Sequence, residues 1–325
     1  MTKSLKFGAL ALAAALTLGA APRPAFDLVI RNAQIYDGSG GAPFRGEVAV
    51  RGDRIAYVGP HAPGGAGREI DAHGKALAPG FINMLSWANE SLIADGRGLS
   101  DLKQGVTLEV MGEGDSMGPL TPEMRTREIA RQGDIRFDIP WSTLGEYLAF
   151  MEKRGVSVNL ASFIGAATAR INVLGEGDVQ PDPAQLAAMR ELVRQAMEEG
   201  AMGVGSSIIY APGAYAKTPE LAALATEAGR CGGVYISHMR SEGDRLIEAV
   251  DELIDISKTS GAPAEIYHLK AGGRSNWDKL DTAIAHIEAA RAAGQRITAD
   301  MYVYPAGSTG LDAARPAGSN SGSCG

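Results

Sequence analysis

The stretch GVYISHMRSEGDRLIEAVDELIDISKTSGAPAEIYHLK, residues 233–270, contains the unit that decides the fold. An apolar, strand-like run ends in His238, and a helical pattern over 244–261 follows it, with apolar residues at i, i+3 and i+4 and a terminal glycine. A second apolar run, 264–268, then ends in His268. A strand, a helix and a further buried-type strand predict parallel strands covered by helices.

The same alternation extends from residue 81 to residue 302. Seven strand-like runs are predicted, at 81–85, 106–111, 156–164, 201–207, 233–238, 264–268 and 296–302. Further helices are predicted at 184–200 and 279–294. Seven units favour an α/β fold of the (β/α)8-barrel type over a doubly wound sheet, which periodicity alone does not exclude.

The parts on either side of this pattern differ from it. Residues 26–80 contain short alternating runs that end in Gly or Asp and predict a small β-subdomain. Residues 81–314 form the predicted barrel, and 315–325 (RPAGSNSGSCG) read as an irregular tail. Because a closed barrel needs eight strands, we expect truncation after strand seven, through a frameshift or fragment near residue 314. Such a barrel has unpaired edges on its first and last strands.

The N-terminus predicts export. Residues 1–21 combine a basic start, an apolar run from Phe7 to Leu18 and a small-residue exit, as in a secretory signal peptide. The run is short for a bilayer span, although an uncleaved anchor is the alternative. We expect a periplasmic or secreted protein with no stable membrane span after cleavage.

Composition excludes several classes of function. The 325 residues include 38 acidic and 31 basic side chains, and the net charge of −7 argues against nucleic acid as a partner. Two cysteines exclude a disulfide framework and a multi-cysteine zinc ribbon. The sequence contains neither a G-x-S-x-G nucleophile elbow nor a Walker loop.

Three candidate metal ligands follow predicted strands. His238 and His268 end two of them, and Glu113 lies between glycines directly after 106–111. The C-terminal ends of barrel strands meet at one mouth, where imidazole nitrogens and a carboxylate oxygen suit zinc. The alternative is a pair of hydrogen-bonded core histidines and a solvated loop glutamate.

Three further polar residues follow the last two strands. Lys270 lies two positions after His268, so on a strand both side chains face the same way. Its ammonium could hold a substrate carboxylate, or it could form a salt bridge at the rim. Tyr302 and Ser308 could hydrogen-bond a polar substrate or simply cap the barrel.

Several linked blocks resemble the D-aminoacylase group of the amidohydrolase superfamily, whose members are N-acyl-D-amino-acid deacylases. The blocks are APGFIN (78–83), GVTLEVMGEG (105–114), IYAPGAYAKTPEL (209–221), YISHMRSEGDRLIEAVDE (235–252), HLKAGG (268–273) and ITADMYVYPAGSTGLD (297–312). The resemblance covers about residues 26–314. It implies a distorted (β/α)8 barrel beside a small β-sandwich.

The resemblance also implies residue roles. It implies one Zn2+ held by His238, His268 and Glu113, the last at a position that is commonly Cys in the group. It further implies that the carboxylate of a small-molecule substrate is bound by Lys270, Tyr302 and Ser308.

Two departures from the group affect the expected activity. Leu85 and Trp87 stand where the group carries H-x-H, so no second zinc is expected there. The group's catalytic aspartate on strand eight has no counterpart that we find, so no catalytic base is assigned and we expect little or no activity from this chain.

The expected function is therefore metal-dependent hydrolysis of a non-peptide C–N amide bond, through deacylation of N-acyl-D-amino acids. Two alternatives stay open: a non-catalytic periplasmic binding relative, and a hydrolase of cyclic imides or dipeptides.

Overall fold

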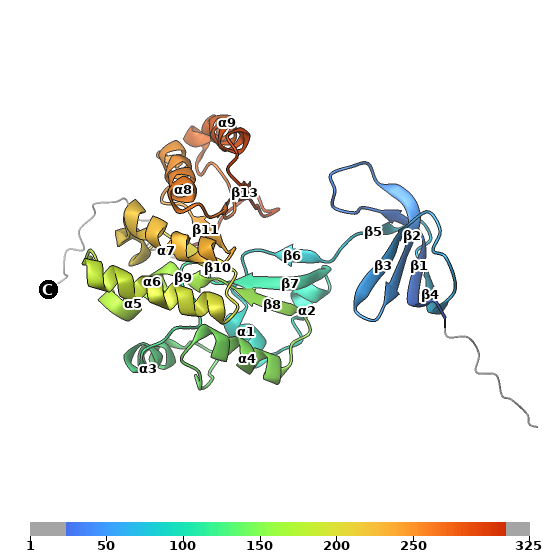
Figure 1. Ribbon diagram of the computed structural model, residues 1–325, viewed down its shortest axis with the longest axis horizontal. Helices are drawn as coiled ribbons and strands as arrows, with labels where there is room; N and C mark the ends of the chain where they lie inside the picture. Colours follow the sequence, from blue (N-terminus) through green and yellow to red (C-terminus); the bar gives the residue numbers. More distant parts are fainter. Residues whose placement is uncertain (1–23, 310–325) are drawn as a thin grey trace, which may run out of the picture. The chain divides into compact units, whose positions relative to one another are not determined.

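The computed structural model describes residues 24–309, which divide into two compact units between Pro79 and Gly80 (Figure 1). The expected signal peptide and the 315–325 tail lie outside the described residues. The two units are described separately below.

The first unit is a mixed β-sheet of five strands. They are β1 (Phe26–Ile35), β2 (Phe44–Arg51), β3 (Arg54–Gly59), β4 (Ala66–Asp71) and β5 (Ala76–Leu77). The order is β3-β2-β1-β4, with β5 also on β1; β1–β2 and β2–β3 are antiparallel, whereas β4 and β5 run parallel to β1. Small apolar clusters form around Val29 and around Ile35. Residues 24–79 thus supply one sheet, and the second layer of the expected sandwich is not among them.

The second unit is built on parallel strands. They are β6 (Phe81–Asn83), β7 (Val106–Met111), β8 (Asn159–Ser162), β9 (Ile164–Gly165), β10 (Gly203–Ser207), β11 (Val234–His238), β12 (Ala264–Ile266) and β13 (Ile297–Ala299). The hydrogen-bonded orders are β6-β7-β8 and β9-β10-β11-β12-β13, and every pair is parallel. Only Phe163 separates β8 from β9, so the two sheets continue each other in chain order. Each of the seven predicted runs contains a strand.

Helices cover these strands. They are α1 (Asn89–Ala94), α2 (Leu99–Leu102), α3 (Pro122–Arg131), α4 (Leu144–Arg154), α5 (Ala166–Leu174), α6 (Pro183–Glu198), α7 (Thr218–Arg230), α8 (Leu246–Ser260) and α9 (Lys279–Ala292). The three predicted helices are confirmed as α6, α8 and α9. Capping explains some of the boundaries: the Asp182 side chain accepts from the Gln185 N–H at the start of α6, and Gly261 ends α8 in the left-handed conformation. None of the described helices is long and apolar enough to cross a membrane.

Packing uses both faces of the strands. The main core includes Val204, Tyr235 and Ile266 from strands together with buried residues of α4 to α9. A separate cluster joins Val110, Phe163, Ile236 and Tyr267. Because Tyr235 and Ile236 are successive residues of β11, their side chains point to opposite faces, so the second cluster fills the face away from the helices. The strand colours run in chain order around this unit, as in a barrel (Figure 1).

Several strands are shorter than predicted, and two of these differences affect the site. β12 ends at Ile266 rather than at 268, and β13 ends at Ala299 rather than at 302. His268 has a φ of +38°, which is incompatible with an extended strand. The side chain of Asp300 accepts a hydrogen bond from the His268 N–H at 2.7 Å, and its carbonyl accepts one from Leu269 at 3.0 Å. These bonds stabilise loops at the positions where further strand was expected.

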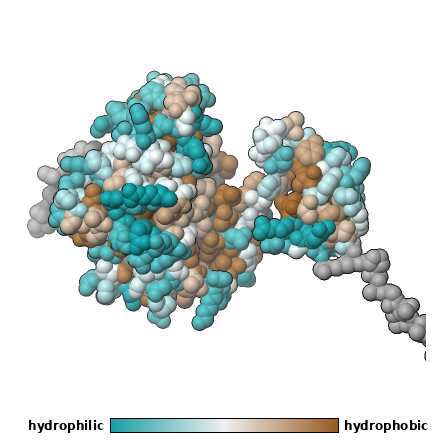
Figure 2. Space-filling model, in the orientation of Figure 1, coloured by the Kyte–Doolittle hydropathy of each residue, from teal (hydrophilic) through white to brown (hydrophobic). Residues whose placement is uncertain are grey.

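The first and last strands of this unit each have one described neighbour. β6 pairs with β7, and β13 pairs with β12. Phe81 and Ile82 on β6 are more than half exposed, as are Met301 and Val303 after β13. Hydrophobic residues gather on the side of the unit where β6 lies (Figure 2). The described strands therefore have the two unpaired edges that the sequence predicts.

Candidate metal centre

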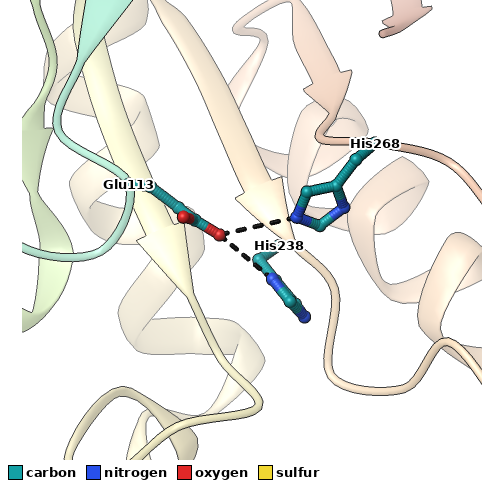
Figure 3. A group of neighbouring side chains, drawn as sticks. All are labelled: Glu113, His238 and His268. Carbon is teal, nitrogen blue, oxygen red and sulfur yellow. Dashed lines mark hydrogen bonds and ion pairs between the residues drawn. The ribbon is translucent and has the colours of Figure 1, made fainter. Parts of the chain in front are cut away.

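The ends of three strands bring the three predicted ligands together. Glu113 lies two residues after β7, His238 is the last residue of β11, and His268 lies two residues after β12. One ligand atom from each side chain lies within 4.8 Å of the other two. The three side chains point toward one another (Figure 3).

Glycines hold the loop that presents Glu113. Gly112 has a φ of +99° and Gly114 a φ of +73°. A Cβ at Gly112 would lie 2.3 Å from the carbonyl oxygen of Phe163, and one at Gly114 would lie 2.6 Å from the Cβ of Ser207. Only glycine fits both the backbone angles and the space, so the GEG sequence turns sharply against the neighbouring strands.

The two carboxylate oxygens of Glu113 have different partners. Its Oε1 lies 3.0 Å from Nδ1 of His238 and 3.6 Å from Nε2 of His268. Its Oε2 accepts a hydrogen bond of 2.9 Å from Nε1 of Trp87. Glu113 and His238 are buried. One oxygen therefore faces the histidines while the other is occupied by the indole.

A second carboxylate, missed by the sequence analysis, lies on the other side of the histidines. Oε1 of Glu242 is 3.0 Å from Nδ1 of His268 and 3.7 Å from Nε2 of His238. Each imidazole thus lies between Glu113 and Glu242. The position of Glu242, four residues after a strand-ending histidine in SHMRSE, could have suggested it, but no local pattern separates it from a solvated loop residue.

These contacts shift the pKa values of both carboxylates and of His268. Burial alone would raise the pKa of Glu113, but hydrogen bonds and the positive charge of His238 and His268 lower it to about 2. For His268, burial lowers the pKa, but the two carboxylates outweigh burial and raise it to about 9. The pKa of Glu242 is lowered, because His268, His238 and Lys270 outweigh its burial.

Lys270 lies beside the cluster for a different reason from the one predicted. Its position does not come from a shared strand face, because β12 ends at Ile266. Instead Nζ of Lys270 lies 2.5 Å from Oε1 of Glu242, 2.9 Å from Nδ1 of His268 and 3.0 Å from the carbonyl oxygen of His268. The two oxygens accept hydrogen bonds from the ammonium, whereas Nδ1 of His268 can accept from Lys270 only when that nitrogen carries no proton. The ion pair expected as the alternative is present.

A cavity of about 1240 Å³ surrounds the cluster. Tyr302 contributes an aromatic ring whose centroid lies 6.1 Å from that of His268 and 5.3 Å from Nζ of Lys270. Ser308 lines the same cavity. The walls include Leu85, Trp87, Glu113, Ser207, Tyr210, His238, Glu242, His268, Lys270, Asp300, Tyr302 and Ser308.

The cluster fits a metal ion chemically. Two imidazoles and a carboxylate are a donor set that zinc accepts, with room for a further ligand on the cavity side. Nε2 of His238 is buried without a hydrogen-bond partner in the described part of the chain. Buried polar atoms are rarely left unpartnered, so this nitrogen is available to a ligand of another kind.

The class of protein to which this fold is similar is the amidohydrolases. A solved D-aminoacylase, described as defining a novel subset of amidohydrolases, matches with a TM-score of 0.75 and 32% identity over 86% of this chain and 59% of that chain. N-acyl-D-glutamate deacylase from Bordetella bronchiseptica, solved with zinc and a phosphonate inhibitor, matches with a TM-score of 0.76 and 29% identity over 86% and 59%.

Sequence comparison identifies the group. N-acyl-D-glutamate deacylase of Alcaligenes xylosoxydans xylosoxydans is 33% identical over 286 residues, 87% of this chain and 58% of the relative. D-aminoacylase of the same organism is 32% identical over 290 residues, 88% of this chain and 59% of the relative. No protein-family model matches. The chain is thus a homologue of the D-aminoacylase group of the amidohydrolase superfamily, and it spans less than two thirds of the length of these relatives.

Proposed function

We propose that this protein is a zinc-dependent amidohydrolase that deacylates N-acyl-D-amino acids. The observation that carries the proposal is the Glu113, His238 and His268 cluster, with one ligand atom of each within 4.8 Å of the others. The homology to N-acyl-D-glutamate deacylase and D-aminoacylase supports the choice of substrate. It favours a deacylase over a non-catalytic binding protein or a hydrolase of cyclic imides or dipeptides.

The proposed cofactor is one Zn2+, held by Glu113, His238 and His268. A bound zinc ion supplies a Lewis acid that polarises the amide carbonyl and activates water. The chain's own residues position the ion's ligands, since Glu242 holds His268.

Lys270, Tyr302 and Ser308 are the proposed anchors for the substrate carboxylate. All three line the cavity that contains the histidines. Because the carboxylate of Glu242 and the carbonyl of His268 already accept from Lys270, the substrate carboxylate would use its remaining donor or replace one of these acceptors. Binding a carboxylate near this lysine orients the amide toward the cluster, which lowers the entropic part of the barrier.

The finer architecture and the location are parts of the same proposal. Among residues 24–309, β6 and β13 each pair on one side only, which supports a (β/α)8-type barrel of which these residues supply seven strand regions. The sheet of the first unit supports the N-terminal part of a β-sandwich subdomain. The sequence of residues 1–21 supports export to the periplasm or medium, and the net charge of −7 supports a small molecule rather than nucleic acid as the partner.

Zinc content and stereoselective ligand binding test the function. The metal-free chain is titrated with zinc, and binding of a phosphonate analogue of N-acetyl-D-methionine is measured with the zinc-loaded protein beside hydrolysis of N-acetyl-D-methionine. We expect one zinc per chain and zinc-dependent binding of the D-phosphonate. Phosphonate binding is included because it reports on the zinc site and its stereoselectivity independently of turnover.

The L-phosphonate and the His238→Ala variant serve as controls. The L-isomer should bind at least tenfold more weakly, and His238→Ala should lose zinc and phosphonate binding together while it keeps its helical circular dichroism. Failure of the wild-type chain to take up zinc, or equal binding of the D and L compounds, contradicts the proposed function.

A further inference from the structure

Trp87 contacts the candidate metal centre in a way that neither the homology nor the proposed function explains. We infer that Trp87 is a positioning residue that holds Glu113 as a one-oxygen ligand and thereby restricts the centre to a single metal ion. The inference rests on the proposed zinc centre, and it explains why that centre would bind one metal ion rather than two.

The hydrogen bond from the indole is the central observation. Nε1 of Trp87 donates to Oε2 of Glu113 at 2.9 Å, while Oε1 of the same carboxylate faces His238 and His268. An indole nitrogen is a donor with no lone pair available, so it cannot bind a metal ion. It therefore satisfies one carboxylate oxygen and leaves the other free to ligate.

The backbone ties Trp87 to the strand that precedes Glu113. The N–H of Ser86 donates to the carbonyl of Val110 in β7 at 2.8 Å. The hydroxyl of Ser86 donates to Oε2 of Glu109, also in β7, at 2.6 Å, and accepts from the N–H of Ala88 at 3.2 Å. Trp87 is thus fixed to β7 through the preceding residue, Ser86, and Glu113 follows the same strand. The indole and the carboxylate are therefore held at a constant separation.

The same contact argues against two metal ions sharing Glu113. A carboxylate that bridges two ions through both oxygens needs Oε2, and Oε2 could bind a second ion only after losing the indole hydrogen bond. Bridging through Oε1 alone would still require further ligands for the second ion. Leu85 and Trp87, which line the cavity beside Glu113, provide an apolar side chain and a hydrogen-bond donor rather than such ligands.

The test removes the indole N–H and measures zinc binding rather than activity. Trp87→Phe keeps an aromatic ring without the donor, and Trp277→Phe is the control, because both tryptophans are 61% exposed. Kd and stoichiometry are measured by calorimetry and by metal analysis after dialysis. We expect one zinc per wild-type chain, a Kd raised by about 10- to 100-fold in Trp87→Phe, the range for loss of a partner that orients a ligand, and no change in Trp277→Phe.

A measurement on the wild-type chain covers the case in which Trp87→Phe does not fold. The protein has three tryptophans, so the assigned indole N–H of Trp87 is followed by NMR during zinc titration. We expect this signal to shift with the first equivalent of zinc and to stay slow in exchange with solvent, since the hydrogen bond persists in the loaded centre.

The outcomes separate this inference from the proposed function. A wild-type chain that binds no zinc overturns the proposed centre itself. A chain that binds zinc while Trp87→Phe retains the wild-type Kd, or that takes up two equivalents, overturns the role of Trp87 alone. A Trp87 indole N–H signal that does not shift during the zinc titration overturns the role of Trp87 as well.

Discussion

At the scale of single residues, the defining feature is two imidazoles held between two carboxylates. Glu113 and Glu242 each approach both His238 and His268. Buried negative charges need compensation, and either protons or a metal ion can supply it. Protons on the histidines and a metal on their nitrogens therefore compete, and the outcome depends on pH.

The affinity for zinc should rise with pH. His268 has its pKa raised from 6.5 to about 9, so at neutral pH zinc must displace its proton. Between pH 6.5 and 9, displacement of this one proton should tighten the Kd by about tenfold for each pH unit, with levelling above 9. Glu113, with a pKa of about 2, adds no slope in this range. Calorimetric titrations at pH 6.5, 7.5, 8.5 and 9.5 check this; a flat profile would contradict it.

The stability of the metal-free protein should change in the opposite direction. A pKa raised in the folded state stabilises the fold below the unfolded value of 6.5, and this stabilisation is lost as the pH rises to about 9. Thermal melts in chelator should therefore show a falling Tm from pH 6.5 to 9, whereas excess zinc should reverse the trend. The same trend with and without zinc would contradict the assignment to His268.

Glu242 should support zinc binding through His268. A carboxylate on the second nitrogen of a ligating histidine fixes the orientation and basicity of the ring, and its loss costs about 10- to 100-fold in metal affinity. Glu242→Gln should raise the zinc Kd within that range. Glu248→Gln, which changes an exposed glutamate on α8 that pairs with Arg245, is the control. Equal Kd values for the two variants would show that Glu242 does not orient the ring.

At the scale of elements, the loop after β7 decides where Glu113 lies. Its glycines touch neighbouring strands so closely that a methyl group does not fit. The site therefore depends on the shape of a loop as much as on the ligand side chain. Elsewhere, glycines of similar φ have open space around them and serve only the local turn.

Gly114→Ala should weaken zinc binding, whereas Gly261→Ala should not. The two residues have φ values of +73° and +74°, and an alanine in the left-handed region costs about 1–2 kcal/mol of backbone strain. Only at Gly114 does the new methyl meet another atom, the Cβ of Ser207 at 2.6 Å. We expect similar strain in both, with a further loss of stability and a raised zinc Kd in Gly114→Ala alone. Chemical denaturation and calorimetry measure the two effects, and an unchanged Kd in Gly114→Ala would disprove the dependence on the loop.

At the scale of the whole molecule, the first and last strands described in the second unit, β6 and β13, each pair with one neighbour. Phe81 and Ile82 expose apolar surface along β6, and Met301 and Val303 do so beyond β13. Unpaired strands with exposed apolar side chains are templates for association. The described barrel strands thus present an edge that favours a further strand or self-association.

Polar replacements at the edge should reduce self-association. Phe81→Lys combined with Ile82→Thr should lower the fluorescence of a bound hydrophobic dye and shift sedimentation toward monomer. The control Ile129→Thr changes an exposed isoleucine on α3, away from either edge strand. If the control has as large an effect as the edge variant, the edge strand is not the surface responsible for self-association.

Much of the architecture could be predicted because the signals are local. The order of strands and helices follows from burial periodicity within short windows, so all seven strand regions appear in the structure. The strand ends predicted at 268 and 302 lie too far along the chain, because a positive φ at His268 and loop hydrogen bonds of Asp300 override the apolar pattern there. Lys270, Tyr302 and Ser308 line the same cavity as the histidines, but their roles remain predictions.

By itself, the sequence determined the alternation of strands and helices, the similarity to known proteins, and the placement of Glu113, His238 and His268 at or just after strands, because each depends on nearby residues. Only the tertiary structure decided which side chains meet: Trp87 with Glu113, Glu242 with His268, and Lys270 with both Glu242 and His268. The physical reason is that hydrogen bonds form over about 3 Å. Such distances are set by how loops from different strands pack, and no periodic pattern along the chain encodes them.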